Sequence, residues 1–176
     1  MLVSDFDFPL PPERIAQTPA ETRDGSRLMT LDRASGSVEH HRFFELPDLL
    51  QDGDLLLLND TKVIPARLHG TRESGGKVEL LLLEEVKRDC WKALARPAKK
   101  VRVGDTLFFG PLRAVVLETG EEGERVVRLE SELPIREALE RIGELPLPPY
   151  ITEKPTDDSR YQTVYAKEEG SAAAPT

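Results

Sequence analysis

The sequence has a single cysteine, three histidines and few aromatic side chains, and these shortages exclude several classes of protein. One thiol, Cys90, cannot form an internal disulfide, and no second cysteine is present to build a zinc site with it. We expect a buried, unreactive thiol. His40 and His41 are adjacent, so in a strand they point to opposite faces and cannot bind one metal ion together. We therefore predict no metal site.

The sequence also lacks a long apolar run. None approaches the roughly 20 residues that a membrane helix needs. The first ten residues have neither the basic flank nor the long apolar core of a secretory signal peptide. We expect a cytoplasmic protein.

The sequence has fewer basic than acidic side chains: 24 Lys and Arg against 32 Asp and Glu, which gives a net charge of −8. This balance argues against a protein that holds nucleic acid mainly by neutralising phosphates, although it leaves room for a local basic patch. The length of 176 residues, 39% of them hydrophobic, suits one full domain or two small ones.

Short strand-like segments follow one another between Pro65 and Pro149. They recur about every ten residues and are separated by glycine-rich turns, a rhythm typical of a small antiparallel barrel or sandwich. The segments are residues 67–72, 77–86, 91–96, 105–110, 112–118 and 124–131. A helix is predicted next, over residues 133–143, because Ile135, Ala138, Leu139 and Ile142 share one face and Gly143 suits the C-terminal cap.

The outer parts of the chain have a different texture. The four leucines of residues 55–58 are typical of a strand buried on both faces of an α/β sheet, and a hairpin is predicted to turn at residues 35–36. Short helices are predicted around residues 11–16 and 46–50. These elements are too few for a complete α/β layer. Either the tail after Pro155 pairs with the N-terminal part in a reduced domain, or the chain is a fragment, which we favour.

The first polar cluster is Asn59, Asp60 and Thr61, which follows the leucine run, with Arg67 beyond a proline turn. In open α/β sheets ligands collect at the carboxyl ends of strands, so these side chains are candidates for a site. The simpler interpretation, favoured when the cluster is taken alone, is an Asx turn with Arg67 paired to Asp60.

The second cluster is Arg23, Ser26 and Arg27 in a segment rich in turn-forming residues. Two arginines suit a phosphate or a carboxylate. The neighbouring acids Glu21 and Asp24 equally allow an ordinary solvated loop, and both interpretations stay open.

The third cluster holds all three tyrosines of the chain, Tyr150, Tyr161 and Tyr165, with Gln162 among them. Aromatic faces beside an amide suit a nucleobase, through stacking and edge hydrogen bonds. The alternation of residues 161, 163 and 165 is equally typical of one face of a plain β-strand, which the residues alone favour.

Taken in order, these motifs resemble one family. "DFDFPLPPERIAQTPAETRDGSRL", "GDLLLLNDTKVIPARLHG", "WKALARPAKKVRVGD" and "GELPLPPYI" followed by "RYQTVYAKEEGSAAAPT" cover nearly the whole chain. Together they are similar to the S-adenosylmethionine:tRNA ribosyltransferase-isomerases of queuosine biosynthesis. The resemblance implies an α/β domain, incomplete in this chain, with an inserted small antiparallel β-barrel domain. The implied domains are residues 1–65, 66–149 and 150–176, the last returning to the α/β domain.

The resemblance also implies the reaction and the partners. Members of the family transfer the ribosyl moiety of S-adenosylmethionine to 7-aminomethyl-7-deazaguanine in a tRNA and rearrange it to epoxyqueuosine. S-adenosylmethionine is then a consumed substrate, and no cofactor is expected. Because members are about twice this length, the resemblance implies a missing C-terminal half as a further partner, without which we expect this chain to be inactive.

Roles follow from residue type and motif position. We expect Asp60 to be a base or a ribose-hydroxyl partner, oriented by Asn59 and Thr61. Arg23, Ser26, Arg27 and Arg67 are candidates for anionic groups of the substrates. A purine-like ring is expected to lie against the tyrosine cluster, with Gln162 reading its edge. The substrate-binding set further includes the terminal Pro175 and Thr176.

Two other classes of function remain as alternatives. One is an RNA-binding β-barrel module without catalysis, for which the basic residues 96–102 are the candidate surface. The other is a half-protein that works only with a second chain.

Overall fold

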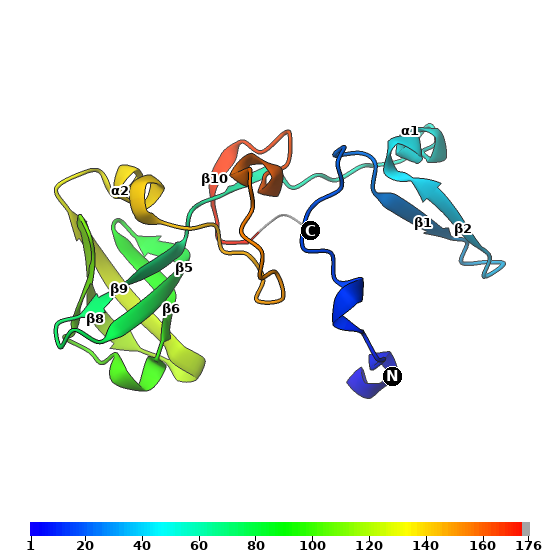
Figure 1. The fold of residues 1–176 in the computed structure, drawn as a ribbon. Coiled ribbons are helices and arrows are strands. Elements are labelled where there is room, and N and C mark those ends of the chain that lie inside the picture. The colour runs from blue at the N-terminus through cyan, green and yellow to red at the C-terminus, as the bar shows by residue number, and fades with distance from the viewer. Residues whose placement is uncertain (174–176) are drawn as a thin grey trace. The chain divides into compact units, whose positions relative to one another are not determined.

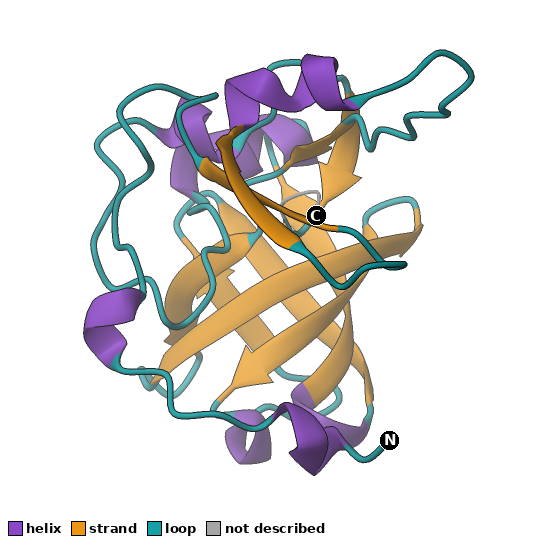
Figure 2. Ribbon diagram, turned by 90° about the vertical axis from the view of Figure 1, so that its right-hand side faces the viewer, coloured by secondary structure: helices purple, strands orange, loops and turns teal. Residues whose placement is uncertain are grey.

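The computed structural model describes residues 1–173, and its largest element is a closed barrel of six antiparallel strands (Figures 1 and 2). The order around the barrel is β4-β5-β6-β9-β8-β7. The strands are β4 (Arg67–Arg72), β5 (Lys77–Lys87), β6 (Cys90–Arg96), β7 (Thr106–Phe109), β8 (Leu112–Thr119) and β9 (Glu124–Ser131). The predicted antiparallel barrel and its six strand segments are therefore confirmed.

Alternating side chains make the barrel interior. Leu68, Leu80 and Leu107 are fully buried, and Ala93 and Ala114 fill the narrower spaces between them. Each fully buried leucine contributes about 1.5–3 kcal/mol through the hydrophobic effect. The same alternation directs Lys, Arg and Glu side chains of these strands to the outside, which explains how a highly charged sequence builds an apolar core.

Two short 3₁₀ helices lie in the loops between barrel strands, η4 (Ala98–Lys100) and η5 (Glu121–Gly123), and a third, η6 (Asp158–Tyr161), follows later in the chain. The helix α2 (Ile135–Ile142) follows the barrel and ends at Gly143, as predicted. Its residues Ala138 and Leu139 are buried in the same hydrophobic cluster as the barrel interior. The helix therefore closes over the barrel with one apolar face.

The chain enters and leaves the barrel at one place. Arg67 and Glu144 form an isolated antiparallel bridge, in which each backbone N–H donates to the carbonyl of the other. Beside them, β3 (Thr61–Val63) pairs in parallel with β10 (Glu168–Ser171). The segments before and after the barrel are thus joined by strand pairing.

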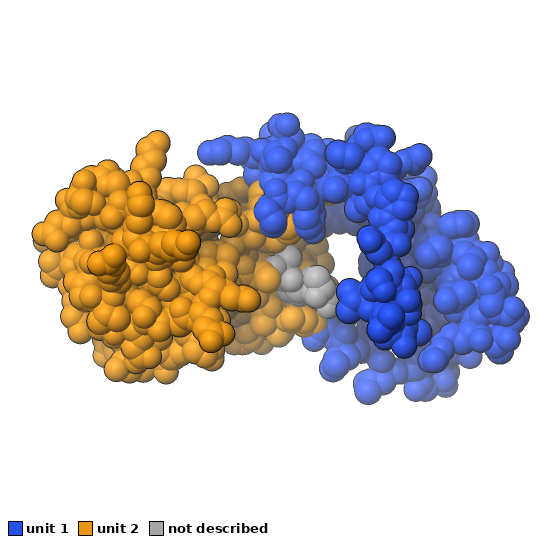
Figure 3. All heavy atoms as spheres, turned by 90° about the horizontal axis from the view of Figure 1, so that it is seen from below, with its two compact units in different colours: residues 1–58, 149–156 blue, residues 59–148, 157–176 orange. Residues whose placement is uncertain are grey.

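The chain divides into two compact units, coloured separately in Figure 3. The barrel, α2 and the β3–β10 pair belong to residues 59–148 and 157–176. Residues 1–58 and 149–156 make the other unit. Its elements are η1 (Val3–Phe6), η2 (Pro12–Arg14), β1 (Arg27–Leu31), β2 (Val38–Arg42), η3 (Phe43–Glu45) and α1 (Leu46–Leu49).

The β1–β2 hairpin turns where the sequence predicts it. Gly36 has a φ of +73°, a backbone conformation that favours glycine, and its N–H donates to the Asp32 carbonyl. The described residues contain one parallel pairing, which is the two-stranded sheet of β3 and β10. The predicted α/β domain, incomplete in this chain, is not established by these elements, and the domain boundaries 1–65, 66–149 and 150–176 stay predictions.

Two predicted strands are wrong. Leu55–Leu58 form no strand, and their side chains are all exposed, Leu55 by 91% and Leu57 by 89%. A strand needs a neighbour for its backbone hydrogen bonds, and the described residues give this segment none. Residues 161–165 also form no strand, because Tyr161 ends η6 and the following residues turn.

Within the described residues, no helix combines the length and the hydropathy that crossing a membrane requires. Cys90 is free and buried, as expected. Residues 1–173 hold no group of three or more His, Cys, Asp or Glu side chains placed to bind a metal ion.

Candidate functional site

The Asn59–Thr61 cluster begins strand β3. The Asn59 side-chain oxygen accepts a hydrogen bond from the Thr61 N–H at 3.0 Å, which is the predicted Asx turn. Asp60 is exposed, and its backbone carbonyl accepts from the N–H groups of Lys167 at 2.7 Å and Glu168 at 3.2 Å. The cluster therefore lies at the amino end of a strand, and not at the carboxyl end of one as predicted, because the leucine segment before it forms no strand.

Gln162 joins the tyrosine motif to this strand. Its side-chain oxygen accepts from the Val63 N–H at 2.9 Å, and its side-chain nitrogen donates to the Val63 carbonyl at 2.8 Å. Val63 is buried, so these two bonds satisfy backbone groups that water does not reach. The structure thus gives Gln162 a backbone-pairing role that the sequence analysis missed.

Two threonine hydroxyls of this region are buried without a hydrogen-bond partner in the described part of the chain. They belong to Thr61 and Thr163, one in each of the two motifs that Gln162 joins. A buried hydroxyl without a partner costs free energy, so each is a candidate to bind a polar group that the described residues do not supply.

The three tyrosines do not share one unit. Tyr161 is half-buried and Tyr165 is 46% exposed, and both belong to the barrel-containing unit. Tyr150 is 57% exposed and belongs to the other unit, where its carbonyl accepts from the Gln17 side chain at 3.0 Å. Pro175 and Thr176 lie outside the described residues.

Arg67, the first residue of β4, contacts both the neighbouring strand β5 and the segment that leaves the barrel. Its guanidinium donates to the Leu147 carbonyl at 3.1 Å and lies 3.7 Å from a Glu79 carboxylate oxygen. The ion pair between Arg67 and Asp60 that the simpler interpretation proposed is replaced by this Glu79 pair. The arginine therefore ties β4 to the segment that leaves the barrel.

The Arg23, Ser26 and Arg27 cluster lies in the unit that holds the hairpin. Arg27 is the first residue of β1, and the Ser26 carbonyl accepts from the Phe43 N–H at 2.9 Å. The three residues surround the start of the hairpin. The structure brings Asn59, Asp60 and Thr61 together with the Gln162 segment, and it places the arginine cluster and Tyr150 in the other unit.

Comparisons with known proteins decide the family. A sequence profile described as "Queuosine biosynthesis protein" matches residues 3–176. A curated protein from Desulfitobacterium hafniense (strain DSM 10664 / DCB-2), named S-adenosylmethionine:tRNA ribosyltransferase-isomerase, is 51% identical over 179 residues. The chain belongs to the queuosine biosynthesis protein family.

The match covers all of this chain and 52% of the Desulfitobacterium protein, so the chain spans about half the length of the curated relative it matches. Among solved structures, the S-adenosylmethionine tRNA ribosyltransferase of Thermotoga maritima is 47% identical. That comparison covers 72% of this chain and 44% of the Thermotoga chain, with a TM-score of 0.35.

Glu169, in the segment "YAKEEG" of this chain, is a charged residue that the sequence did not single out. Its carboxylate binds Arg136 of α2 and lies 3.4 Å from the Lys62 ammonium of β3. These two hydrogen bonds lower the pKa of Glu169, Arg136 first, below its ordinary value of 4.5. The residue therefore connects β10, β3 and α2 by charge.

A small pocket adjoins this charged group. It has a volume of about 50 Å³ and is lined by residues including Val63, Trp91, Leu139 and Glu169. The Trp91 indole nitrogen is buried without a hydrogen-bond partner in residues 1–173. A volume of this size is enough for a water or a small polar group.

Proposed function

We propose that the chain is the N-terminal part of a tRNA-modifying transferase-isomerase. The substrate would be S-adenosylmethionine, consumed as a ribosyl donor, and the acceptor 7-aminomethyl-7-deazaguanine in tRNA, giving epoxyqueuosine. No cofactor takes part in this proposal. Membership of the queuosine biosynthesis protein family and the name of the 51% identical relative support it.

One observation carries the assignment of the site. The two hydrogen bonds between Gln162 and Val63 hold the "RYQTVYA" motif against the "NDTKVIPARL" motif, although 99 residues separate them. The backbone bonds from residues 167 and 168 to Asp60 add a second connection. An exposed carboxylate, two buried threonine hydroxyls and an aromatic side chain thereby belong to one unit.

The proposed reaction gives each of these side chains a role. The protons on the ribose carbon next to a sulfonium are acidic, so a positioned carboxylate can remove one. The amine of the modified base then attacks the anomeric carbon as adenine departs, and adenine and methionine are released. Asp60 is the proposed base, with Asn59 and Thr61 orienting the ribose or the base. Tyr161 and Tyr165 offer stacking faces for a purine-like ring.

The other predicted substrate-binding residues keep their proposed roles. Arg23, Ser26, Arg27 and Tyr150 would bind anionic or aromatic parts of the two substrates, as would Pro175 and Thr176. The residues of the unit that holds the hairpin belong to an α/β domain, of which this chain supplies a part. The rest of the active site then comes from the other half of the relatives' length, and the protein works in the cytoplasm.

The test is product formation. tRNA carrying the precursor base is incubated with S-adenosylmethionine and a protein of the relatives' full length that contains this sequence, and the digested nucleosides are analysed by mass spectrometry. We expect epoxyqueuosine from the full-length protein and none from residues 1–176 alone. Absence of the product with full-length protein of native fold would refute the proposed function.

The base assignment has its own comparison. Asp60→Asn in the full-length protein is expected to lower kcat at least 100-fold, since a positioned base contributes about 10²–10⁴-fold. Asp52→Asn, also exposed and on the same stretch of chain, is the matched control and keeps its rate. Retention of the full rate by Asp60→Asn would remove Asp60 from catalysis without touching the proposed reaction.

A further inference from the structure

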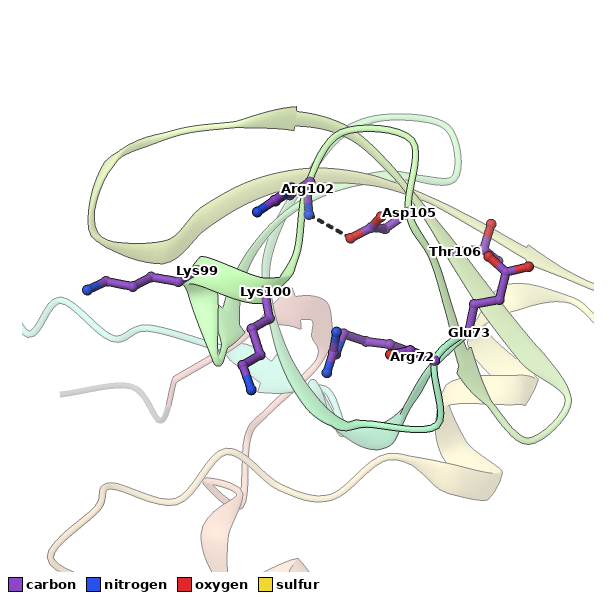
Figure 4. A pocket seen from close by; sticks show the side chains of 8 residues that line it. Arg72, Glu73, Lys99, Lys100, Arg102, Asp105 and Thr106 are labelled. Atoms are coloured by element: carbon purple, nitrogen blue, oxygen red, sulfur yellow. Dashed lines mark hydrogen bonds between the residues drawn. The ribbon is translucent and has the colours of Figure 1, made fainter.

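A second pocket lies on the barrel, and the basic segment of residues 96–102 noted in the sequence supplies part of its lining. It has a volume of about 350 Å³ and lies between the β4–β5 turn and the segment that joins β6 to β7. Figure 4 shows Arg72 reaching across it and Lys100 extending from the opposite wall, while Lys99 points away. The full lining is Arg72, Glu73, Ser74, Lys99, Lys100, Arg102, Asp105 and Thr106.

The charge of this pocket is opposite to that of the protein. Four cationic side chains and two carboxylates line it, a balance of +2, whereas the chain carries −8. The two carboxylates do not neutralise it fully. Asp105 accepts a hydrogen bond from the Arg102 backbone N–H at 2.8 Å, and Glu73 extends away from Arg72 (Figure 4). A compact basic site on an acidic protein attracts anions selectively.

The cations of the pocket are not used in ion pairs. Some other barrel cations are paired, as Arg113 and Arg128 are with Glu130. Over residues 1–173, no ion pair includes Arg72 or the three cations of residues 99–102. The Nε of Arg72 is moreover buried, and no group in the described part of the chain forms a hydrogen bond with it. A bound anion would satisfy groups that the fold leaves without partners.

A buried arginine holds the loop that carries three of these cations. Arg125 is 7% exposed, and its guanidinium donates to the carbonyls of Ala98 and Val101. Its position on β9 alternates with the buried Val127 and Leu129, so it points inward like a core residue. Because the loop is fixed before any ligand arrives, binding costs little ordering of the backbone.

We propose that this pocket binds backbone phosphate of the RNA substrate, an inference whose choice of RNA rests on the proposed function. The lining combines Arg and Lys with the hydroxyl residues Ser74 and Thr106, the residue types that contact phosphates in protein–nucleic acid complexes. The volume admits a phosphate with part of its ribose. The pocket positions the RNA and does not read its sequence.

The experiment measures tRNA binding as a function of salt, using fluorescence anisotropy with the complete 176-residue chain. The test variant is Lys100→Gln with Arg102→Gln. The control is Lys87→Gln with Arg88→Gln at the β5–β6 turn, which removes the same charge from another part of the barrel. We expect the test variant to weaken binding at least tenfold and to lower the slope of log K against log salt by about 1–2, one unit for each lost phosphate contact.

The outcomes separate the possibilities. Equal affinities and equal slopes for the two variants, with equal thermal unfolding, would overturn the proposal. If the unaltered chain binds inorganic phosphate and the test variant does not, while tRNA binding is the same for both, the proposal is also overturned, because the pocket would then be a site for free anions.

Failure of the proposed function is distinguishable from failure of this inference. If the full-length protein forms no epoxyqueuosine while the test variant still lowers the tRNA salt slope, the proposed reaction falls and the RNA site stands. If the product forms and the slopes are equal, only the RNA site falls.

Discussion

Gln162 binds both the N–H and the carbonyl of Val63 through one side-chain amide, as a neighbouring strand would through its backbone. Val63 is 3% exposed and ends β3, just before the chain enters the barrel. The Gln162 side chain therefore connects the segment around residue 162 to β3, which is also paired with β10. The arrangement depends on an amide, because only Asn and Gln carry a donor and an acceptor side by side.

The first prediction concerns this amide. Gln162→Ala leaves two buried backbone groups of Val63 unpaired, so the free energy of unfolding should fall by about 1–3 kcal/mol. Urea unfolding followed by circular dichroism measures the change. Gln51→Ala is the control, because Gln51 is exposed, and it should change stability by less than about 0.5 kcal/mol. A loss no larger than that of the control would mean that water replaces the amide at Val63.

The second prediction concerns the buried arginine of β9. Arg125→Met should lower the free energy of unfolding by about 2–3 kcal/mol, because the charged hydrogen bonds to the Ala98 and Val101 carbonyls are lost. Hydrogen exchange of residues 98–102 should accelerate more than exchange in the strands. Arg128→Met on the same strand removes a 49% exposed side chain paired with Glu130 and should cost at most about 1 kcal/mol. Similar losses for both variants would contradict the anchoring role of Arg125.

The third prediction is a pH dependence. Hydrogen bonds from Arg136 and Lys62 lower the pKa of Glu169, so its folded-state pKa lies below the unfolded value near 4.5. Its contribution to stability is then fully present above pH 4.5 and is lost as the pH falls through the folded-state pKa. Thermal unfolding of the wild type and Glu169→Gln between pH 3 and pH 7 measures it. The difference between the two proteins should shrink toward low pH, and a difference independent of pH would contradict the charge role.

The fourth prediction concerns Gly143, the residue that ends α2. A Cβ at this position would lie 2.1 Å from the Pro65 carbonyl oxygen and 2.7 Å from the Leu139 carbonyl oxygen, both backbone atoms. Gly143→Ala should therefore cost about 1–3 kcal/mol of stability through overpacking. At Gly120 the nearest atoms belong to the flexible Glu124 side chain, so Gly120→Ala is the control and should be tolerated. Equal melting temperatures for the two variants would show that the chain around Pro65 yields.

The barrel was predictable because its signals are local. Turn residues such as Gly75 and Gly110, both with positive φ, separate segments whose alternation already separates inside from outside. The helix at Ile135–Ile142 was predictable for the same reason, since one face and one cap define it. Arg125 is the exception that the alternation could have revealed, because it occupies an inward position within the predicted segment of residues 124–131.

The outer segments were not predictable from local pattern. The four leucines of residues 55–58 have strand composition, yet a strand forms only with a partner, and partners are fixed by residues far away in the chain. β10 was missed because "EEGS" has no strand propensity and is held by pairing with β3 and by the Glu169 charges. For the candidate site, the turn at Asn59 followed from residue type, whereas Gln162 and Val63 make contact across a sequence separation of 99 positions.

The bridge between Arg67 and Glu144 gives the barrel a modular character. The first residue of the barrel is hydrogen-bonded to a residue just beyond α2. The barrel and α2 together therefore leave the chain and return to it at nearly the same place. A segment with adjoining ends can be gained or removed in a single genetic event without moving the flanking residues, as insertions with close termini are. We therefore expect residues 64–146 to fold when expressed alone, and evolution to have altered this barrel independently of the segments on either side of it.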